Sequence, residues 1–159
     1  MAKAVKTNAM RMLSAAKISF EVMEYEVDEN DLSGVHVANQ IGIDKDRVFK
    51  TLVAKGDKNS YMVFCIPCAF ELDLKKCAKV SGDKRVELIP VKDLLGITGY
   101  IRGGCSPVGM KKLFPTFIDE TALLWDTITI SAGVRGCQLT LNPDSLAKLI
   151  DASFCDITA

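Results

Sequence analysis

The sequence predicts an α+β fold, with helices placed around a mixed or antiparallel β-sheet. Two pairs of β-prone segments are joined by short turns, which is typical of hairpins. Short amphipathic segments with helical spacing lie between and beside these hairpins. The chain has 159 residues, of which 48% are hydrophobic, so we expect one domain over residues 1–159 with a well-filled core.

The first half of the chain begins with an amphipathic segment and continues into a hairpin. We expect a helix over residues 4–16, a strand over 18–27 and a short helix after Ser33 and Gly34. The hairpin pairs residues 47–55 with residues 61–66 across the turn GDKNS.

The second half of the chain alternates in the same way. Asp73 can cap a helix over 74–80, a strand follows at 85–89, and one or two helical turns at 91–96 end at Gly96. Residues 98–112 are rich in glycine and have no clean period, which predicts a loop. Strands are then expected at 115–120, 126–132 and 137–141, and Asn142-Pro143 begins the last helix.

Composition and charge limit the classes of function. No apolar run approaches the roughly 20 residues that a membrane span needs, and the N-terminus lacks the apolar core of a signal peptide. We therefore expect a cytoplasmic protein whose six cysteines are free thiols. The net charge is zero, but residues 75–112 contain nine bases and three acids, which could attract a polyanion or form an ordinary solvated surface.

Lys50 lies in a predicted strand that is apolar on both faces. In an extended chain its side chain leaves on the same side as Leu52, and Thr51 leaves on the opposite side. A lysine in such a strand is partly removed from water and needs a partner or a function. The alternative is a lysine that extends to solvent at the end of the sheet.

Two further segments are candidates for binding. Residues 103–109, GGCSPVG, contain three glycines that permit close backbone approach, and free N–H groups there could hold a phosphate or an oxyanion. The segment matches neither the P-loop nor the G-x-G-x-x-G pattern, and a tight structural turn is the alternative. Residues 131–138, SAGVRGCQ, place Ser131 at the end of a strand and Arg135 in a turn.

The sequence lacks the residues that a serine-histidine catalytic triad or a metal site would need. His36 is the only histidine, so Ser131 has no local base and no triad motif. We expect neither a metal nor a cofactor, because one histidine and scattered cysteines match no known ligand spacing. Cys65 and Cys68 form a C-x-x-C pattern, but along an extended strand their Cα atoms would lie about 10 Å apart, beyond the roughly 7 Å of a disulfide.

Several segments occur in an order that resembles one family. They are VFKTLVA, ELDLKKCAKVSGDKRVEL, TGYIRGGCSPVGMKK, PTFID, ITISAGVRG and LAKLIDASFCDI. Together they resemble the YbaK/EbsC family of aminoacyl-tRNA deacylases, which is related to the editing domain of bacterial prolyl-tRNA synthetases. The likeness covers essentially the whole chain, and it is strongest to the YbaK branch, which removes cysteine from mischarged tRNA(Pro).

The resemblance implies a mixed, mostly antiparallel β-sheet, partly closed like a barrel and flanked by helices. It also implies a pocket for the aminoacylated 3′-terminal adenosine of tRNA. Lys50 matches the essential lysine, which would hold the terminal nucleotide or the ester oxygen that becomes charged. The other positions that match substrate-binding residues are Tyr25, Gly103, Gly104, Ser106, Pro107, Gly109, Ser131, Gly133, Arg135 and Gly136.

The implied reaction needs positioning and oxyanion stabilisation, because an aminoacyl ester is already activated. In the YbaK branch the thiol of the substrate is thought to attack its own ester and release a thiolactone, which would be a lyase reaction rather than hydrolysis. The chain departs from some relatives at Ser33, Cys105, Ala132 and Gln138. Removal of alanine or another small residue therefore stays open.

Two other classes of function remain as alternatives. The first is a non-catalytic module that binds tRNA or a synthetase, with prolyl-tRNA synthetase as the candidate partner. The second is a thiol-redox or zinc protein that uses Cys65 and Cys68, which ranks lower. No DNA or membrane partner is expected.

Overall fold

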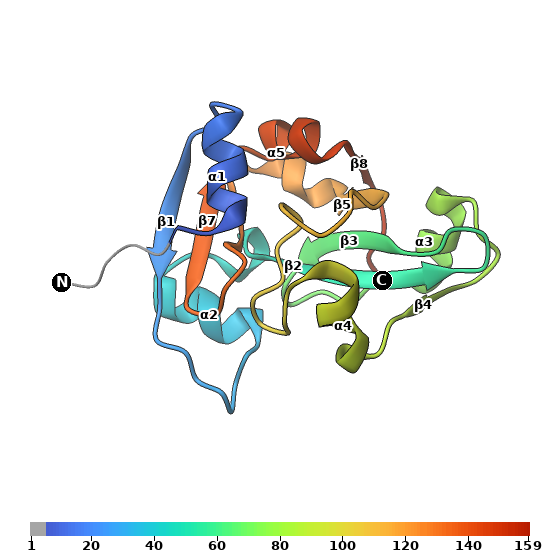
Figure 1. Cartoon of the computed structure of the whole chain (residues 1–159), viewed down its shortest axis with the longest axis horizontal. Coiled ribbons are helices and arrows are strands. Elements are labelled where there is room, and N and C mark those ends of the chain that lie inside the picture. Colours follow the sequence, from blue (N-terminus) through green and yellow to red (C-terminus); the bar gives the residue numbers. More distant parts are fainter. Residues whose placement is uncertain (1–5) are drawn as a thin grey trace.

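Residues 6–159 are described by the computed structural model, and they alternate between helices and strands (Figure 1). The helices are α1 (Asn8–Ala15), α2 (Gly34–Ile41), α3 (Leu74–Ser81), α4 (Val91–Thr98) and α5 (Pro143–Ile150). The strands are β1 (Phe20–Glu24), β2 (Phe49–Gly56), β3 (Met62–Pro67), β4 (Val86–Leu88), β5 (Thr116–Asp119), β6 (Ile128–Ser131), β7 (Cys137–Leu141) and β8 (Ala152–Cys155). Short 3-10 helices cover Lys45–Arg47 and Glu120–Leu124. None of the helices in this part of the chain is long and apolar enough to span a membrane.

The strands of residues 6–159 form two sheets. One is antiparallel with the order β1-β7-β6, and the other is mixed with the order β4-β2-β3-β5-β8. Only the β3–β5 and β5–β8 pairs are parallel, so the predicted α+β fold with a mixed, mostly antiparallel arrangement is confirmed. The two sheets do not close into a barrel, and an isolated bridge between Val48 and Thr129 links them.

Two hydrophobic cores lie on opposite faces of the β2–β3 hairpin. The larger core contains Val53 together with Leu139 of the three-stranded sheet. The smaller core contains Ala54 and Phe64, which pack with Cys77 of α3. Because neighbouring residues of a strand point to opposite faces, Val53 and Ala54 belong to different cores. This arrangement explains why both faces of β2 are apolar.

Some predicted boundaries differ from the structure. α1 begins at Asn8 after the N-cap Thr7, so Lys6 and Thr7 are not helical, contrary to the prediction, and the predicted residues 4 and 5 lie outside the described residues. β1 ends at Glu24 rather than at residue 27. α4 continues through Gly96 and ends at Thr98, where the C-cap Gly99 has a φ of 88° that suits glycine. β8 and the two 3-10 helices were not predicted.

Asp83 ties the turn between β2 and β3 to the end of α3. Its carboxylate accepts hydrogen bonds from the backbone N–H groups of Lys58 (2.7 Å) and Asn59 (3.0 Å). The Ser81 hydroxyl (2.7 Å) and the Asn59 side-chain amide (2.9 Å) also donate to it. These donors, the Ser81 hydroxyl first, hold the pKa of Asp83 well below its ordinary value.

We expect the substitution Asp83→Asn to lower the free energy of unfolding by about 1–3 kcal/mol at neutral pH, because several donors lose a charged acceptor. The pKa of Asp83 is lower in the folded state, so its contribution is present above the unfolded value of about 3.9 and is lost as pH falls below it. Urea unfolding at neutral pH and at about pH 3 measures both effects. The difference between wild type and variant should shrink in acid, and an undiminished difference would contradict this account. Glu21→Gln, at an exposed position of β1, is the control.

Candidate active site

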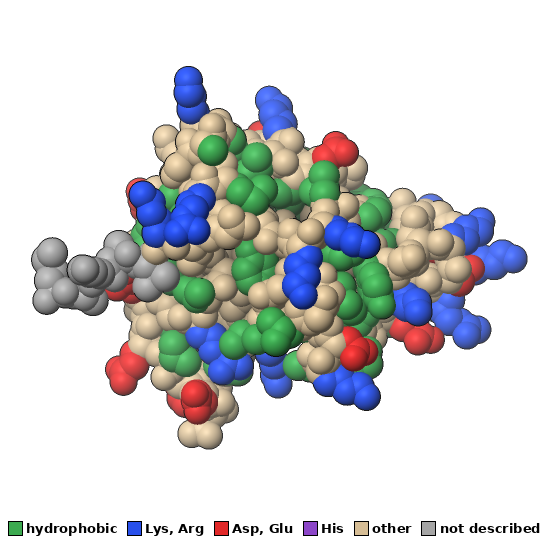
Figure 2. All heavy atoms as spheres, viewed as in Figure 1, with side chains coloured by type: hydrophobic (Ala, Val, Ile, Leu, Met, Phe, Trp, Pro, Cys, Tyr) green, Lys and Arg blue, Asp and Glu red, His purple; other side chains and the backbone are tan. Residues whose placement is uncertain are grey.

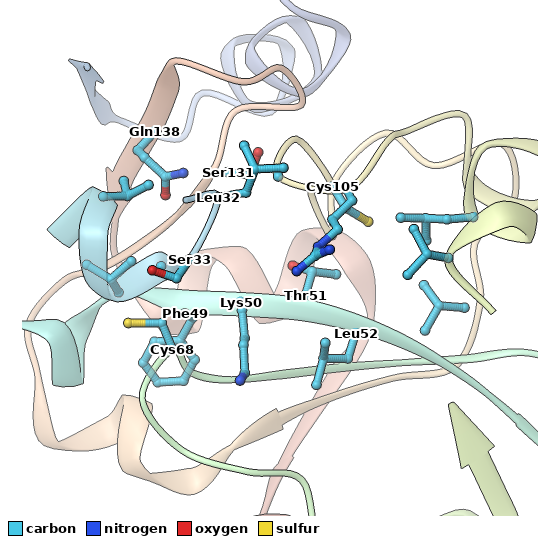
Figure 3. Close-up of a pocket in the computed structure, with 18 of the residues that line it drawn as sticks. Leu32, Ser33, Phe49, Lys50, Thr51, Leu52, Cys68, Cys105, Ser131 and Gln138 are labelled. Carbon is cyan, nitrogen blue, oxygen red and sulfur yellow. The ribbon is translucent and has the colours of Figure 1, made fainter. Parts of the chain in front are cut away.

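A cavity of about 440 Å³ opens beside the middle of β2 (Figure 3). Its walls come from β2, α4, the first turn of α2 with the residues before it, the glycine-rich loop, and the hairpin of β6 and β7. Lys50 and Arg102 line this cavity, and no aspartate or glutamate of the described chain does. The cavity is therefore a site of positive potential that favours negatively charged groups.

One edge of β2 is unpaired where the strand borders the cavity. The Val48 carbonyl accepts a hydrogen bond from the Cys68 N–H on the β3 side. The Val53 carbonyl accepts one from the Ile89 N–H on the other side, at the start of the contact with β4. Because backbone groups alternate between the two sides of a strand, the N–H and C=O of Thr51 face away from β3. These two groups can bind a molecule in the cavity.

Lys50 leaves β2 on the face that carries Leu52, whereas Thr51 leaves on the other face, as the alternation predicts (Figure 3). The side chain is partly buried, and within residues 6–159 its ammonium forms no ion pair. In Figure 3 the ammonium points away from Ser131 and Gln138. Its charge is therefore not neutralised within the described chain, and it partly offsets the rise that burial causes in the pKa of the neighbouring Cys68 thiol.

Tyr25 reaches the cavity from the segment that follows β1. Its N–H donates to the Gly136 carbonyl at 3.0 Å. The side-chain amide of Gln40 in α2 binds both backbone groups of the next residue, Glu26, at 3.3 Å and 3.1 Å. The backbone at Tyr25 and Glu26 is therefore anchored beside the cavity.

The structure brings part of the predicted site together. Among the predicted residues, Lys50, Tyr25, Gly103 and Ser131 line the cavity. The others are not among the lining residues, and their contact with a substrate stays a prediction; they are Gly104, Ser106, Pro107, Gly109, Gly133, Arg135 and Gly136.

Several of these residues hold the two glycine-containing segments against each other. A Cβ added at Gly104 would lie 3.0 Å from the backbone N of Arg135, so the segments touch through their backbones. The Arg135 Nε donates to the Arg102 carbonyl at 2.9 Å. The segments at 102–104 and 134–135 therefore form one rigid wall of the site.

The side chain of Tyr100 leaves no room for a Cβ at two further positions, which are both glycine. A Cβ at Gly109 would lie 2.8 Å from the Tyr100 hydroxyl, and a Cβ at Gly133 would lie 2.8 Å from its Cε1. The hydroxyl donates to the Val108 carbonyl. The Ser106 hydroxyl accepts from the Val108 N–H at 3.2 Å, so it stabilises the loop from inside.

Gln138 is a lining residue that was not predicted as part of the site. It pairs with Ser131 across the β6–β7 hairpin, and it lies across the cavity from Ser33 (Figure 3). Its side chain is 6% exposed, and its Oε1 has no hydrogen-bond partner in the described chain. The sequence could have indicated Gln138, because the predicted hairpin places it directly opposite Ser131, and directly opposed residues lie on the same face of a sheet.

The cysteines of the C-x-x-C pattern have different surroundings. Cys65 is fully buried in the larger core, and burial raises its pKa to about 12. Cys68 lines the cavity and donates to the Lys45 carbonyl at 3.3 Å. Cys105 also lines the cavity, and burial raises its pKa to about 12. All of these cysteines are free, and residues 6–159 contain no cluster of three or more potential metal ligands.

Comparison with known proteins agrees with the resemblance found in the sequence. The model of the aminoacyl-tRNA editing domain matches residues 32–149. EbsC of Enterococcus faecalis, whose name proposes a Cys-tRNA(Pro)/Cys-tRNA(Cys) deacylase, is 50% identical over 153 residues, which cover 96% of this chain and 93% of EbsC. The uncharacterised protein YwhH of Bacillus subtilis is 26% identical over 128 residues, which cover 79% of this chain and 81% of YwhH.

A solved structure described as a proposed trans-editing enzyme for prolyl-tRNA synthetase superposes with a TM-score of 0.81. The match covers 98% of this chain and 99% of that structure at 21% identity, so it supports the fold alone. The family match and the EbsC match together confirm the family: the chain belongs to the aminoacyl-tRNA editing domain family.

Proposed function

We propose that this protein is a trans-editing deacylase that cleaves the ester of mischarged aminoacyl-tRNA, with Cys-tRNA(Pro) as its substrate. The observation that carries the proposal is the cavity at the open edge of β2, which combines Lys50 with free backbone groups and no carboxylate. The 50% sequence identity to EbsC over nearly the whole chain supports Cys-tRNA(Pro) as the substrate. Residues 1–159 act as one unit in this proposal, in the cytoplasm, with prolyl-tRNA synthetase as the partner that supplies the tRNA.

The terminal adenosine and its aminoacyl group occupy the cavity in this proposal. Lys50 and Arg102 attract the negatively charged nucleotide, and no carboxylate opposes them. Tyr25 provides an aromatic surface from one wall, and Gly103 and Ser131 border the ester from the other. The Thr51 N–H is a donor for the ester carbonyl, whose oxygen gains negative charge as the ester is cleaved.

The attacking group comes from the substrate or from water. If the cysteinyl thiol attacks its own carbonyl carbon, the ester C–O bond breaks, the thiol proton passes to the departing ribose oxygen, and a thiolactone leaves. If water attacks, free amino acid leaves and tRNA regains its hydroxyl in the same way. The thiols of the protein are poor nucleophiles here, because burial raises the pKa of Cys68 and of Cys105.

We expect Lys50→Ala to lower kcat/KM for deacylation of Cys-tRNA(Pro) by about 10- to 100-fold, because the variant loses a charged contact that holds the nucleotide in the cavity. Release of the amino acid from charged tRNA measures the rate. Lys55→Ala is the matched control, because Lys55 is an exposed lysine of the same strand. A Lys50→Ala variant that keeps the wild-type rate would remove Lys50 from the mechanism.

We expect Cys68→Ser and Cys105→Ser to keep most of the deacylase activity, because the reacting thiol belongs to the substrate. The same release assay measures this, and thermal unfolding checks that each variant is folded. If either substitution abolishes activity in a folded variant, a thiol of the protein takes part and the proposed reaction is wrong.

We expect cysteine to be released from tRNA(Pro) faster than serine, alanine or proline, since only cysteine carries a thiol. Its rate should rise with pH as the substrate thiol ionises, with an ordinary pKa of about 8.5. Mass spectrometry of the product distinguishes thiolactone from free cysteine. Equal rates for cysteine and alanine would instead assign the protein to hydrolysis of small aminoacyl esters.

A further inference from the structure

An exposed apolar strip begins at the mouth of the cavity and follows α4. Leu88 of β4 and Val91 of α4 line the cavity, yet they are 48% and 61% exposed. Leu95 lies one helical turn beyond Val91 and is 55% exposed. We call these three residues the α4 strip. Large aliphatic side chains that continue from a binding site into solvent indicate a contact surface for part of the ligand.

Basic side chains flank the α4 strip. Arg102 lines the cavity beside it, and Lys92 is exposed on α4 itself. Lys111 is held at the far end of the helix, where its Nζ donates to the Gly96 carbonyl at 3.2 Å. Figure 2 shows Lys and Arg side chains beside hydrophobic ones over the region where Figure 1 places α4.

Acidic residues are fewer in this region. Glu87 and Asp93 are the acids among residues 84–112, which contain six lysines and arginines. The whole chain has a formal net charge of zero, so the surplus of positive charge is local to this segment. A flexible polyanion would be attracted here rather than to the protein as a whole.

We propose that the α4 strip, with Lys92, Arg102 and Lys111, binds the unpaired nucleotides that precede the terminal adenosine of the tRNA. This rests on the proposed function, which places that adenosine in the cavity. The preceding nucleotides must then leave through the mouth, where the strip begins. Proteins hold single-stranded nucleic acid by apolar contact with the bases and basic contact with the phosphates, and the strip offers both.

A stable protein partner fits the α4 strip less well. Protein interfaces use about 20–30 residues on each side, whereas the strip consists of three exposed aliphatic side chains. Its flanking lysines are also a residue type that is depleted from such interfaces.

The test compares two substrates with two pairs of variants. Leu95→Glu and Lys92→Glu change the strip at exposed positions. Leu124→Glu and Lys148→Glu are matched controls, because Leu124 is 78% exposed and Lys148 is exposed on α5, away from α4 in Figure 1. The substrates are Cys-tRNA(Pro) and the 3′-cysteinyl ester of adenosine, which lacks the preceding nucleotides.

We expect the strip variants to reduce kcat/KM about tenfold for Cys-tRNA(Pro). In a plot of log(kcat/KM) against log salt concentration, the slope should become shallower by about 0.7 for each phosphate that the variant no longer binds. Cleavage of the adenosine ester should not change, which also shows that the variants are folded. The control variants should match wild type on both substrates.

Three results would overturn the inference: equal losses on both substrates, no loss on tRNA, or a loss that occurs only when prolyl-tRNA synthetase is present. The last result would assign the strip to a protein partner. Failure of the proposed function is distinguishable, because wild type would then cleave neither substrate.

Discussion

The pairing of β2 with β3 is the interaction on which the rest of the molecule depends. It runs from Phe49–Pro67 to Ala54–Met62, and each face of the resulting ribbon closes one hydrophobic core. The bridge from Val48 to Thr129 then holds the second sheet beside the same strand. In the described chain, the edge of β2 around Thr51 pairs with no other strand, and the cavity lies beside this unpaired edge.

That position also accounts for the chemical character of the cavity. Buried peptide groups need hydrogen-bond partners, so an open strand edge inside a cavity must be satisfied by water or by a ligand. Lys50 lies on the face of β2 that carries Leu52, its side chain is partly buried, and its ammonium has no acidic partner in the described chain. A rigid scaffold that presents donors and positive charge suits a reaction in which negative charge develops on an oxygen.

Local chemistry made much of the fold predictable. The N-caps Ser33, Asp73 and Asn142 all accept hydrogen bonds at the helix starts that the sequence indicated, and both hairpins form in the expected segments. Gly96 was misread because a glycine can sit inside a helix whose next residue, Ile97, packs on the core. β8 was missed because four residues that pair in parallel with a distant strand carry no local signal.

The site was predictable to a smaller extent. Alternation along β2 and the strand end at Ser131 gave residues that do line the cavity. The contact between residues 102–104 and 134–135, and the place of Tyr100 between Gly109 and Gly133, are tertiary relations that spacing does not encode. The side-chain amide of Gln40 makes another such tertiary contact, because it hydrogen-bonds both the N–H and the C=O of Glu26, as a neighbouring strand would. The place of Tyr25 on the cavity wall thus depends on a side chain outside that wall, so a substitution at Gln40 would alter the shape of the cavity without changing any residue that lines it.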